Sequence, residues 1–179
     1  MTIGIDVSQL AYRNTGVANY LKSLLNALVN EDNDVRYIFF FSSLRGQLDV
    51  SDLPKGPNIT LKKFPFPPAL LALIWNKLHI LPIDMFIGKV DLFLTSDWTE
   101  PPLRNGKKAT ILYDLIVYKN PNESADLIVQ NQKRKLQWVK KESDLVFCIS
   151  EATKNDAQEV LGLSPDKLNV IYPGLTVAG

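Results

Sequence analysis

The first residues that can do chemistry lie at a turn near the N-terminus, where an apolar segment runs toward a glycine. Residues 2–7 predict a strand, and Gly16 then opens an amphipathic segment, with Thr15 before it as the predicted N-cap and Val17 after it. The first turn of a helix has free N–H groups and the positive end of the helix dipole, so this turn is a candidate anion site. It has one glycine and matches neither the dinucleotide-binding fingerprint nor the P-loop. Taken alone, it is better explained as an ordinary strand-to-helix turn.

Polar and aromatic residues follow three later apolar segments, at 91–95, 108–112 and 144–149. The candidates for ligand contacts at these places are Asp97, Trp98, Glu100, Tyr113, Asp114, Ser150 and Glu151. A tryptophan beside carboxylates suits a sugar, because the ring can stack on the sugar and the carboxylates can bind its hydroxyls. In the alternative interpretation, Trp98 packs under its loop, Asp114 caps a loop and Ser150 caps the helix that follows it.

The elements that must position these residues alternate along the chain. Apolar runs predict strands at 2–7, 35–41, 59–64, 91–95, 108–112, 144–149 and 168–171. Helical spacing predicts helices at 16–29, 69–79, 121–143 and 151–161. This alternation predicts a Rossmann-like α/β fold of three layers, with a mainly parallel sheet covered on both faces. Ligands of such folds gather at the carboxyl ends of the strands, which is where the candidate residues lie.

The composition excludes several classes of protein. Hydrophobic residues make up 46% of the 179 residues, which allows a full core. The 20 Lys and Arg nearly balance the 19 Asp and Glu, which argues against a dedicated nucleic-acid binder. With one histidine and one cysteine, no internal disulfide can form and we expect no metal site. No signal peptide and no apolar run of about 18 residues is visible, so we expect a cytoplasmic protein.

Two surfaces leave a second interpretation open. Residues 69–79 are apolar on nearly every side, so they predict a helix that is either buried or in contact with something apolar outside, and His79 at its end is expected to be a satisfied buried histidine. Five basic residues of the segment 121–143 ordinarily form a solvated face: Lys133, Arg134, Lys135, Lys140 and Lys141. In the alternative, they join the apolar side chains Leu70, Leu73, Ile74 and Trp75 in a peripheral contact with the inner face of a membrane.

Three stretches, in order, resemble the N-terminal domain of the family-4 (group 1) retaining glycosyltransferases of GT-B fold. The first is residues 14–20 after the strand at 2–7, and the second is residues 91–95 with 101–102, followed by 109–116 and Pro121. The third is residues 146–156 with 161–163 and 167–174. Each motif alone is weak, whereas three in register over nearly the whole chain are specific.

The resemblance implies roles for the candidate residues. Thr15, Gly16 and Val17 would approach the diphosphate of a nucleotide-sugar donor, and Tyr113 with Asp114 would orient sugar hydroxyls at the catalytic centre. Substrate contacts would come from Asp97, Trp98, Glu100, Ser150 and Glu151. Tyr113 stands where the family usually has histidine. Because the pKa of tyrosine is about 10, it can donate a hydrogen bond but cannot take a charged role at neutral pH.

The expected function follows from the resemblance. We expect residues 1–172 to form the acceptor-side domain and 173–179 to begin the linker to a donor-binding domain that this sequence does not contain. The whole enzyme would transfer a hexose, for example mannose, from a nucleotide-sugar to a glycan or lipid-linked acceptor with retention. It would need no cofactor and no metal, and this domain alone would be inactive.

A second hypothesis is a stand-alone α/β binding module for a small anionic ligand or a protein partner. The discriminating observation is the length of the source gene. A gene that ends near Gly179 would exclude the two-domain enzyme. A gene that continues for a similar length, with two glutamates eight positions apart, would exclude the binding module.

Overall fold

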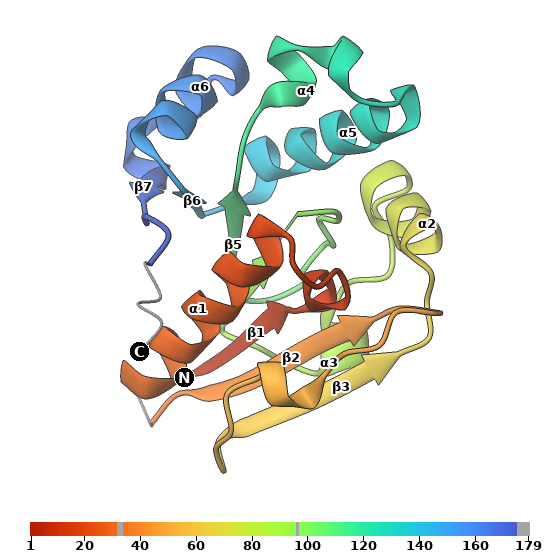
Figure 1. Cartoon of the computed structure of the whole chain (residues 1–179), viewed down its shortest axis with the longest axis vertical. Helices are drawn as coiled ribbons and strands as arrows, with labels where there is room; N and C mark the ends of the chain where they lie inside the picture. The colour runs from red at the N-terminus through yellow and green to blue at the C-terminus, as the bar shows by residue number, and fades with distance from the viewer. Residues whose placement is uncertain (32–33, 96, 175–179) are drawn as a thin grey trace.

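The structure is a computed structural model that describes residues 1–31, 34–95 and 97–174. The strands within these ranges form one parallel sheet (Figure 1). The strands are β1 (Thr2–Asp6), β2 (Arg36–Ser42), β3 (Ile59–Phe64), β4 (Leu92–Thr95), β5 (Lys107–Leu112), β6 (Leu145–Cys148) and β7 (Leu168–Val170). Their order is β3-β2-β1-β4-β5-β6-β7, and every neighbouring pair is parallel. The predicted α/β class with a Rossmann-like parallel sheet is confirmed. The predicted linker at 173–179 lies largely outside the described residues.

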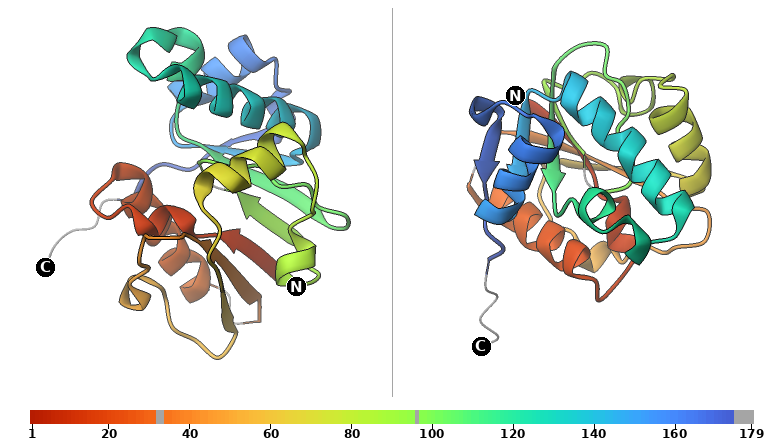
Figure 2. Two further views of the ribbon diagram at one scale, coloured as in Figure 1. Left: turned by 90° about the vertical axis from the view of Figure 1, so that its right-hand side faces the viewer. Right: turned by 90° about the horizontal axis from the view of Figure 1, so that it is seen from above.

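Helices cover both faces of this sheet (Figure 2). The longer ones are α1 (Gly16–Glu31), α5 (Asp126–Glu142) and α6 (Glu151–Leu161). Short ones are η1 (Ser8–Ala11), η2 (Val50–Asp52), α2 (Pro68–Leu71), the π-helix η3 (Ala72–Lys77), α3 (Asp84–Ile87), α4 (Ile116–Lys119), η4 (Pro121–Glu123) and η5 (Pro165–Lys167). Helix α1 packs on one face, whereas α2, η3, α3 and α5 lie on the other.

The packing of β1 explains its glycine. A Cβ on Gly4 would lie 2.7 Å from the ring of Phe93 and 2.8 Å from the side chain of Ile87. Both of these side chains are buried at 1% exposure or less, so neither can move aside cheaply. Gly4 therefore lets α3 and β4 pack closely against the central strand.

Two predicted helices differ from the structure. The segment 121–143 contains a short turn, η4, and then Ala125 in an extended conformation, so that α5 begins only at Asp126. Pro121 begins the turn rather than the helix, since proline suits any first helical position. The segment 69–79 is α2 followed by the π-helix η3, and the positive φ of His79 (54°) ends it.

The strand order reverses direction at β1, which is paired with β2 on one side and β4 on the other. The chain leaves β1 toward α1 on one face and leaves β4 toward η3 on the other. In parallel sheets such a divergence creates a crevice at the carboxyl ends of the two strands. The loops that hold the candidate residues start at this crevice and at the adjacent ends of β5 and β6.

Candidate functional site

The glycine turn is built as the sequence predicts, with Thr15 as the cap of α1. The Thr15 hydroxyl accepts a hydrogen bond from the Ala18 N–H (3.2 Å) and donates one to the Tyr12 carbonyl (3.0 Å). The N–H groups of Gly16 and Val17 lie in the first turn of α1, where N–H groups have no acceptor within the helix. A Cβ on Gly16 would meet no atom within 4 Å, so this turn faces open space. The turn can receive an anion, and its role in binding one stays a prediction.

A cavity of about 160 Å³ lies beyond the carboxyl end of β5, and we call it the β5 pocket. The polar and aromatic side chains in its lining include Asp97, Trp98, Tyr113, Asp114, Gln132 and Lys135. The structure thus brings together four of the predicted site residues, which come from two separate loops. Carboxylates, an amide and a phenol around a small cavity can bind a ligand rich in hydroxyl groups.

Tyr113 connects this pocket to α1. Its ring is half-buried and meets the ring of Tyr20 edge to face, with centroids 5.6 Å apart, and its carbonyl accepts a hydrogen bond from the Thr153 hydroxyl (3.1 Å). Tyr20 lies one helical turn after Gly16. The contact therefore packs the first half of α1 against the end of β5.

Asp114 and Asp97 differ in their surroundings. Asp114 is exposed, and one of its carboxylate oxygens accepts a hydrogen bond from the Ile116 N–H (3.0 Å) at the start of α4, as the loop-capping alternative predicts. Burial raises the pKa of Asp97 and the like charge of Asp114 raises it further, while the Lys135 ammonium and the Gln132 amide act to lower it. Asp97 is thus a partly desolvated acceptor at the wall of the pocket.

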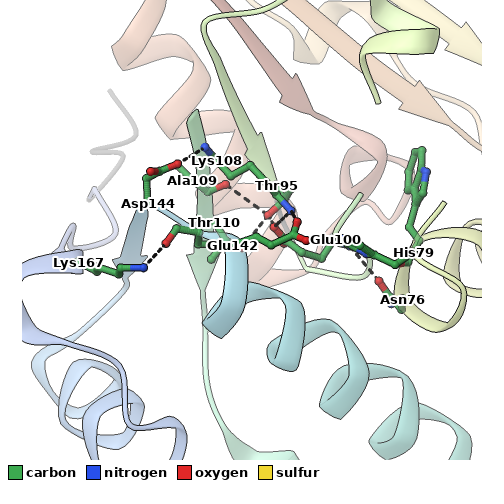
Figure 3. A network of polar contacts seen from close by, with 12 residues as sticks. Asn76, His79, Thr95, Glu100, Lys108, Ala109, Thr110, Glu142, Asp144 and Lys167 are labelled. Carbon is green, nitrogen blue, oxygen red and sulfur yellow. Dashed lines mark hydrogen bonds and ion pairs between the residues drawn. The ribbon is translucent and has the colours of Figure 1, made fainter. Parts of the chain in front are cut away.

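Glu100 does not face the pocket and needs a correction. Its side chain is fully buried, with Oε2 accepting a hydrogen bond from the Thr95 hydroxyl (2.6 Å) and Oε1 lying 3.1 Å from the Lys108 ammonium (Figure 3). The contact with Lys108 is an ion pair without hydrogen-bond alignment. Because solvent does not reach this carboxylate, it cannot touch a ligand. It instead ties the loop after β4 to Thr95 and Lys108 of the sheet.

The ion pairs continue from Glu100 to a histidine. Lys108 also lies 2.9 Å from Oε2 of Glu142, whose other oxygen is 2.9 Å from Nε2 of His79 (Figure 3). Burial acts to raise the pKa of Glu142, but Lys108 and His79 together hold it below its usual value. The His79 ring stacks on Trp138 at 3.5 Å, and its Nδ1 is 2.8 Å from the Trp75 carbonyl. His79 is the satisfied histidine that the sequence predicts.

Lys135 is a buried charge that the sequence does not reveal, because the basic residues around it predict a solvated face. It is only 2% exposed, and burial lowers the pKa of its ammonium while the carboxylates of Glu100, Asp97 and Asp6 act to raise it. Helical spacing could have found it, since residues 128, 132, 135 and 139 follow one face of α5. We call Lys135, Glu100, Asp97 and Asp6 the switch-point cluster. Burial raises the pKa of Asp6 as well.

At the end of β6, Ser150 caps α6 as the alternative interpretation states. Its hydroxyl accepts a hydrogen bond from the Thr153 N–H (3.1 Å), and Glu151 is exposed in the first turn of the helix. Their contact with a ligand stays a prediction. In the described ranges 1–31, 34–95 and 97–174, no group of three His, Cys, Asp or Glu side chains is placed to hold a metal ion. No helix within these ranges has the length and apolarity to cross a membrane.

Known proteins provide an independent comparison. No curated protein matches the chain. Among solved structures, it is similar to the crystal structure of the Bordetella bronchiseptica enzyme WbmH in complex with NAD+, with a TM-score of 0.44 and 10% identity. The alignment covers 83% of this chain and 54% of that one, so the chain spans about half the length of that enzyme. The family model described as Glycosyltransferase Family 4 matches residues 14–178. The chain therefore belongs to glycosyltransferase family 4, in which it corresponds to the N-terminal domain.

Proposed function

We propose that the chain is the acceptor-side domain of a retaining enzyme that transfers a hexose from a nucleotide-sugar to a glycan or lipid-linked acceptor. The observation that carries this proposal is the β5 pocket, where Asp97, Tyr113 and Asp114 surround a cavity of about 160 Å³. The contact between Tyr113 and Tyr20 links this pocket to the helix that begins at the open turn of Gly16, which supports the proposal. A sugar and a diphosphate that are joined in one donor need such adjacent sites.

The roles of the residues follow from their chemistry. The N–H groups of Gly16 and Val17, at the positive end of α1, would stabilise negative charge on the leaving diphosphate. The Asp97 and Asp114 carboxylates would accept hydrogen bonds from sugar hydroxyls, and the Tyr113 hydroxyl would donate or accept one. Ser150 and Glu151, at the neighbouring strand end, would contact the substrate from the side of α6. The remaining diphosphate contacts would come from a donor-binding domain.

The test is a transfer assay on the chain joined to the C-terminal half from its source gene, with a panel of UDP-, GDP- and ADP-hexoses. We expect turnover with one donor and none for the chain alone. Gly16→Leu should then reduce kcat/KM at least tenfold while the melting temperature stays unchanged, because the added side chain enters open space. Gly16→Ala is the matched control for the loss of glycine itself. A folded two-domain protein without turnover on any donor would refute the proposal and favour the binding module.

A further inference from the structure

A groove of about 300 Å³ runs between η3 and the first half of α5, and it is separate from the β5 pocket. Its walls are mainly apolar and include Ala72 and Leu73 from η3 and Leu127 and Ile128 from α5. Leu127 is 76% exposed and Leu73 43%, so apolar side chains from both walls are in contact with solvent. The structure thus leaves uncovered a hollow that water solvates poorly.

The groove is held open by a buried asparagine. Asn76 is 2% exposed, and its side-chain NH₂ donates to the Trp98 carbonyl and to the Asn131 side chain, both at 2.9 Å. Its side-chain oxygen accepts from the Glu100 N–H (2.9 Å), and its carbonyl accepts from the Trp138 ring N–H (2.9 Å). These bonds fix η3, the loop after β4 and α5 relative to one another, so the groove exists before any ligand arrives.

The charges around the groove have one sign. Among the described residues that line it, the charged ones are Lys77 and Arg134, and none is acidic. The groove adjoins the proposed sugar site, because Trp98 and Ile128 line both the groove and the β5 pocket. A ligand that occupies both would have a polar end at Asp97 and an apolar end beside Leu127, with an anionic group near Arg134.

We propose that the groove binds the apolar chain of an acceptor that carries a phosphate next to that chain. This inference rests on the proposed function and selects, between a glycan and a lipid-linked acceptor, the lipid-linked one. The apolar walls supply the binding energy, the cations select the phosphate, and the shared Trp98 directs the head of the acceptor toward the β5 pocket. An acceptor whose apolar chain is bound in this way leaves the glycine turn at Gly16 free for the donor.

The test is calorimetric titration of the protein with n-hexyl, n-octyl and n-decyl phosphate, each below its micellar concentration. We expect one site per chain and an affinity that rises about fourfold per added methylene until the groove is full. Leu127→Asp should weaken binding at least tenfold, whereas Leu44→Asp, at another exposed leucine that does not line the groove (59% exposed), should leave binding unchanged. Arg134→Gln should weaken binding of n-octyl phosphate but not of n-octyl glucoside.

Several results would overturn the inference. They are no binding, affinity independent of chain length, equal binding by the wild type and Leu127→Asp, or binding to anionic vesicles without binding of monomeric alkyl phosphates. Dimers that Leu127→Asp dissociates would show that a second copy covers the groove instead. Because these readouts need no sugar transfer, turnover without alkyl phosphate binding refutes only this inference. Alkyl phosphate binding without turnover in the two-domain protein refutes the proposed function.

Discussion

Replacing Lys135 by methionine tests whether the switch-point cluster holds the loops at the carboxyl ends of β1 and β4. Methionine keeps most of the length and apolar stem of the lysine but removes its charge. The buried carboxylate of Glu100 and the partly buried carboxylate of Asp97 then lose the attraction of an opposite charge. Removing one partner of a buried ion pair costs about 3–5 kcal/mol, because the remaining charge stays in a poorly polarisable interior. Methionine also removes the cost of burying the lysine ammonium, and this offsets part of the loss. We therefore expect the free energy of unfolding to fall by about 3 kcal/mol at pH 7.5.

The loss should depend on pH with a definite sign. Burial raises the pKa values of Asp6 and Asp97 in the folded protein above their unfolded values, and the ammonium of Lys135 opposes this rise. Without Lys135 both folded pKa values rise further, so the folded state binds protons more tightly than the unfolded chain does. The destabilisation is therefore fully present above the folded pKa values and disappears as the pH falls below the unfolded ones. The cost of Lys135→Met should be smaller at pH 5 than at pH 7.5.

Urea unfolding at both pH values measures these free energies, and a loss of about 3 kcal/mol corresponds to a melting temperature lower by roughly 6–12 °C. The matched control is Lys140→Met, an exposed lysine on the same helix, which should change stability by no more than about 0.5 kcal/mol. If Lys135→Met unfolds like the wild type at pH 7.5, or loses more stability as the pH falls, the charge argument is wrong.

Three further substitutions separate packing, capping and binding. Gly4→Ala should cost about 1–3 kcal/mol in urea unfolding, because its Cβ would lie 2.7 Å from the buried ring of Phe93; an unchanged midpoint would mean that the core adapts. Ser150→Ala should lower the free energy of unfolding by about 1 kcal/mol, since the Thr153 N–H loses its acceptor, and differential scanning calorimetry measures this loss. Tyr113→Phe keeps the ring contact with α1 and should reduce kcat/KM of the two-domain enzyme about 2–10-fold if the hydroxyl binds sugar. Wild-type kinetics in this last variant would remove the hydroxyl from the mechanism.

The strands were predictable because each is a short apolar run whose neighbours in sequence break the pattern. The interior of β2, with Phe39 and Phe40 fully buried, has no polar residue to expose, which indicates a strand covered on both faces. The cap of α1 at Thr15 and the end of α6 at Gly162, with φ of 63°, also follow from residue type. Local chemistry is enough for these elements.

The segment 69–79 shows where local chemistry is not enough. Its apolarity on nearly every side predicts either burial or contact with something apolar outside, but not which side chains do which: Leu70 is 37% and Leu73 43% exposed, while Trp75 is buried at 1%. The π-helix adds a residue to the turn and changes which side chains face inward, and its main anchor is the tertiary bonding of Asn76. No periodicity within the segment encodes partners that lie more than twenty residues away.

The burial of Glu100 and Lys135 could not be predicted from either residue alone. Each charge is tolerated inside because the other elements bring an opposite charge to it: Lys108 from β5 to Glu100, and carboxylates from two strand ends to Lys135. A sequence shows that a charge is present but not whether a partner will arrive, and an unpaired charge would remain at the surface. The helical register of Lys135 was the one local signal, and it was outweighed by the basic residues around it.

This dependence also bears on the role of the buried charges at the reversal of strand order. Asp6 follows β1, Asp97 and Glu100 follow β4, and Lys135 reaches them from α5. Apolar side chains could fill the same space, but they would fix the spacing of these loops less strictly, because dispersion does not distinguish one apolar neighbour from another, whereas opposite charges attract one another specifically. Buried ion pairs contribute little net stability. The switch-point cluster is therefore better explained by positioning than by stability, and the loops that it positions are those that supply Asp97 and Trp98 to the β5 pocket.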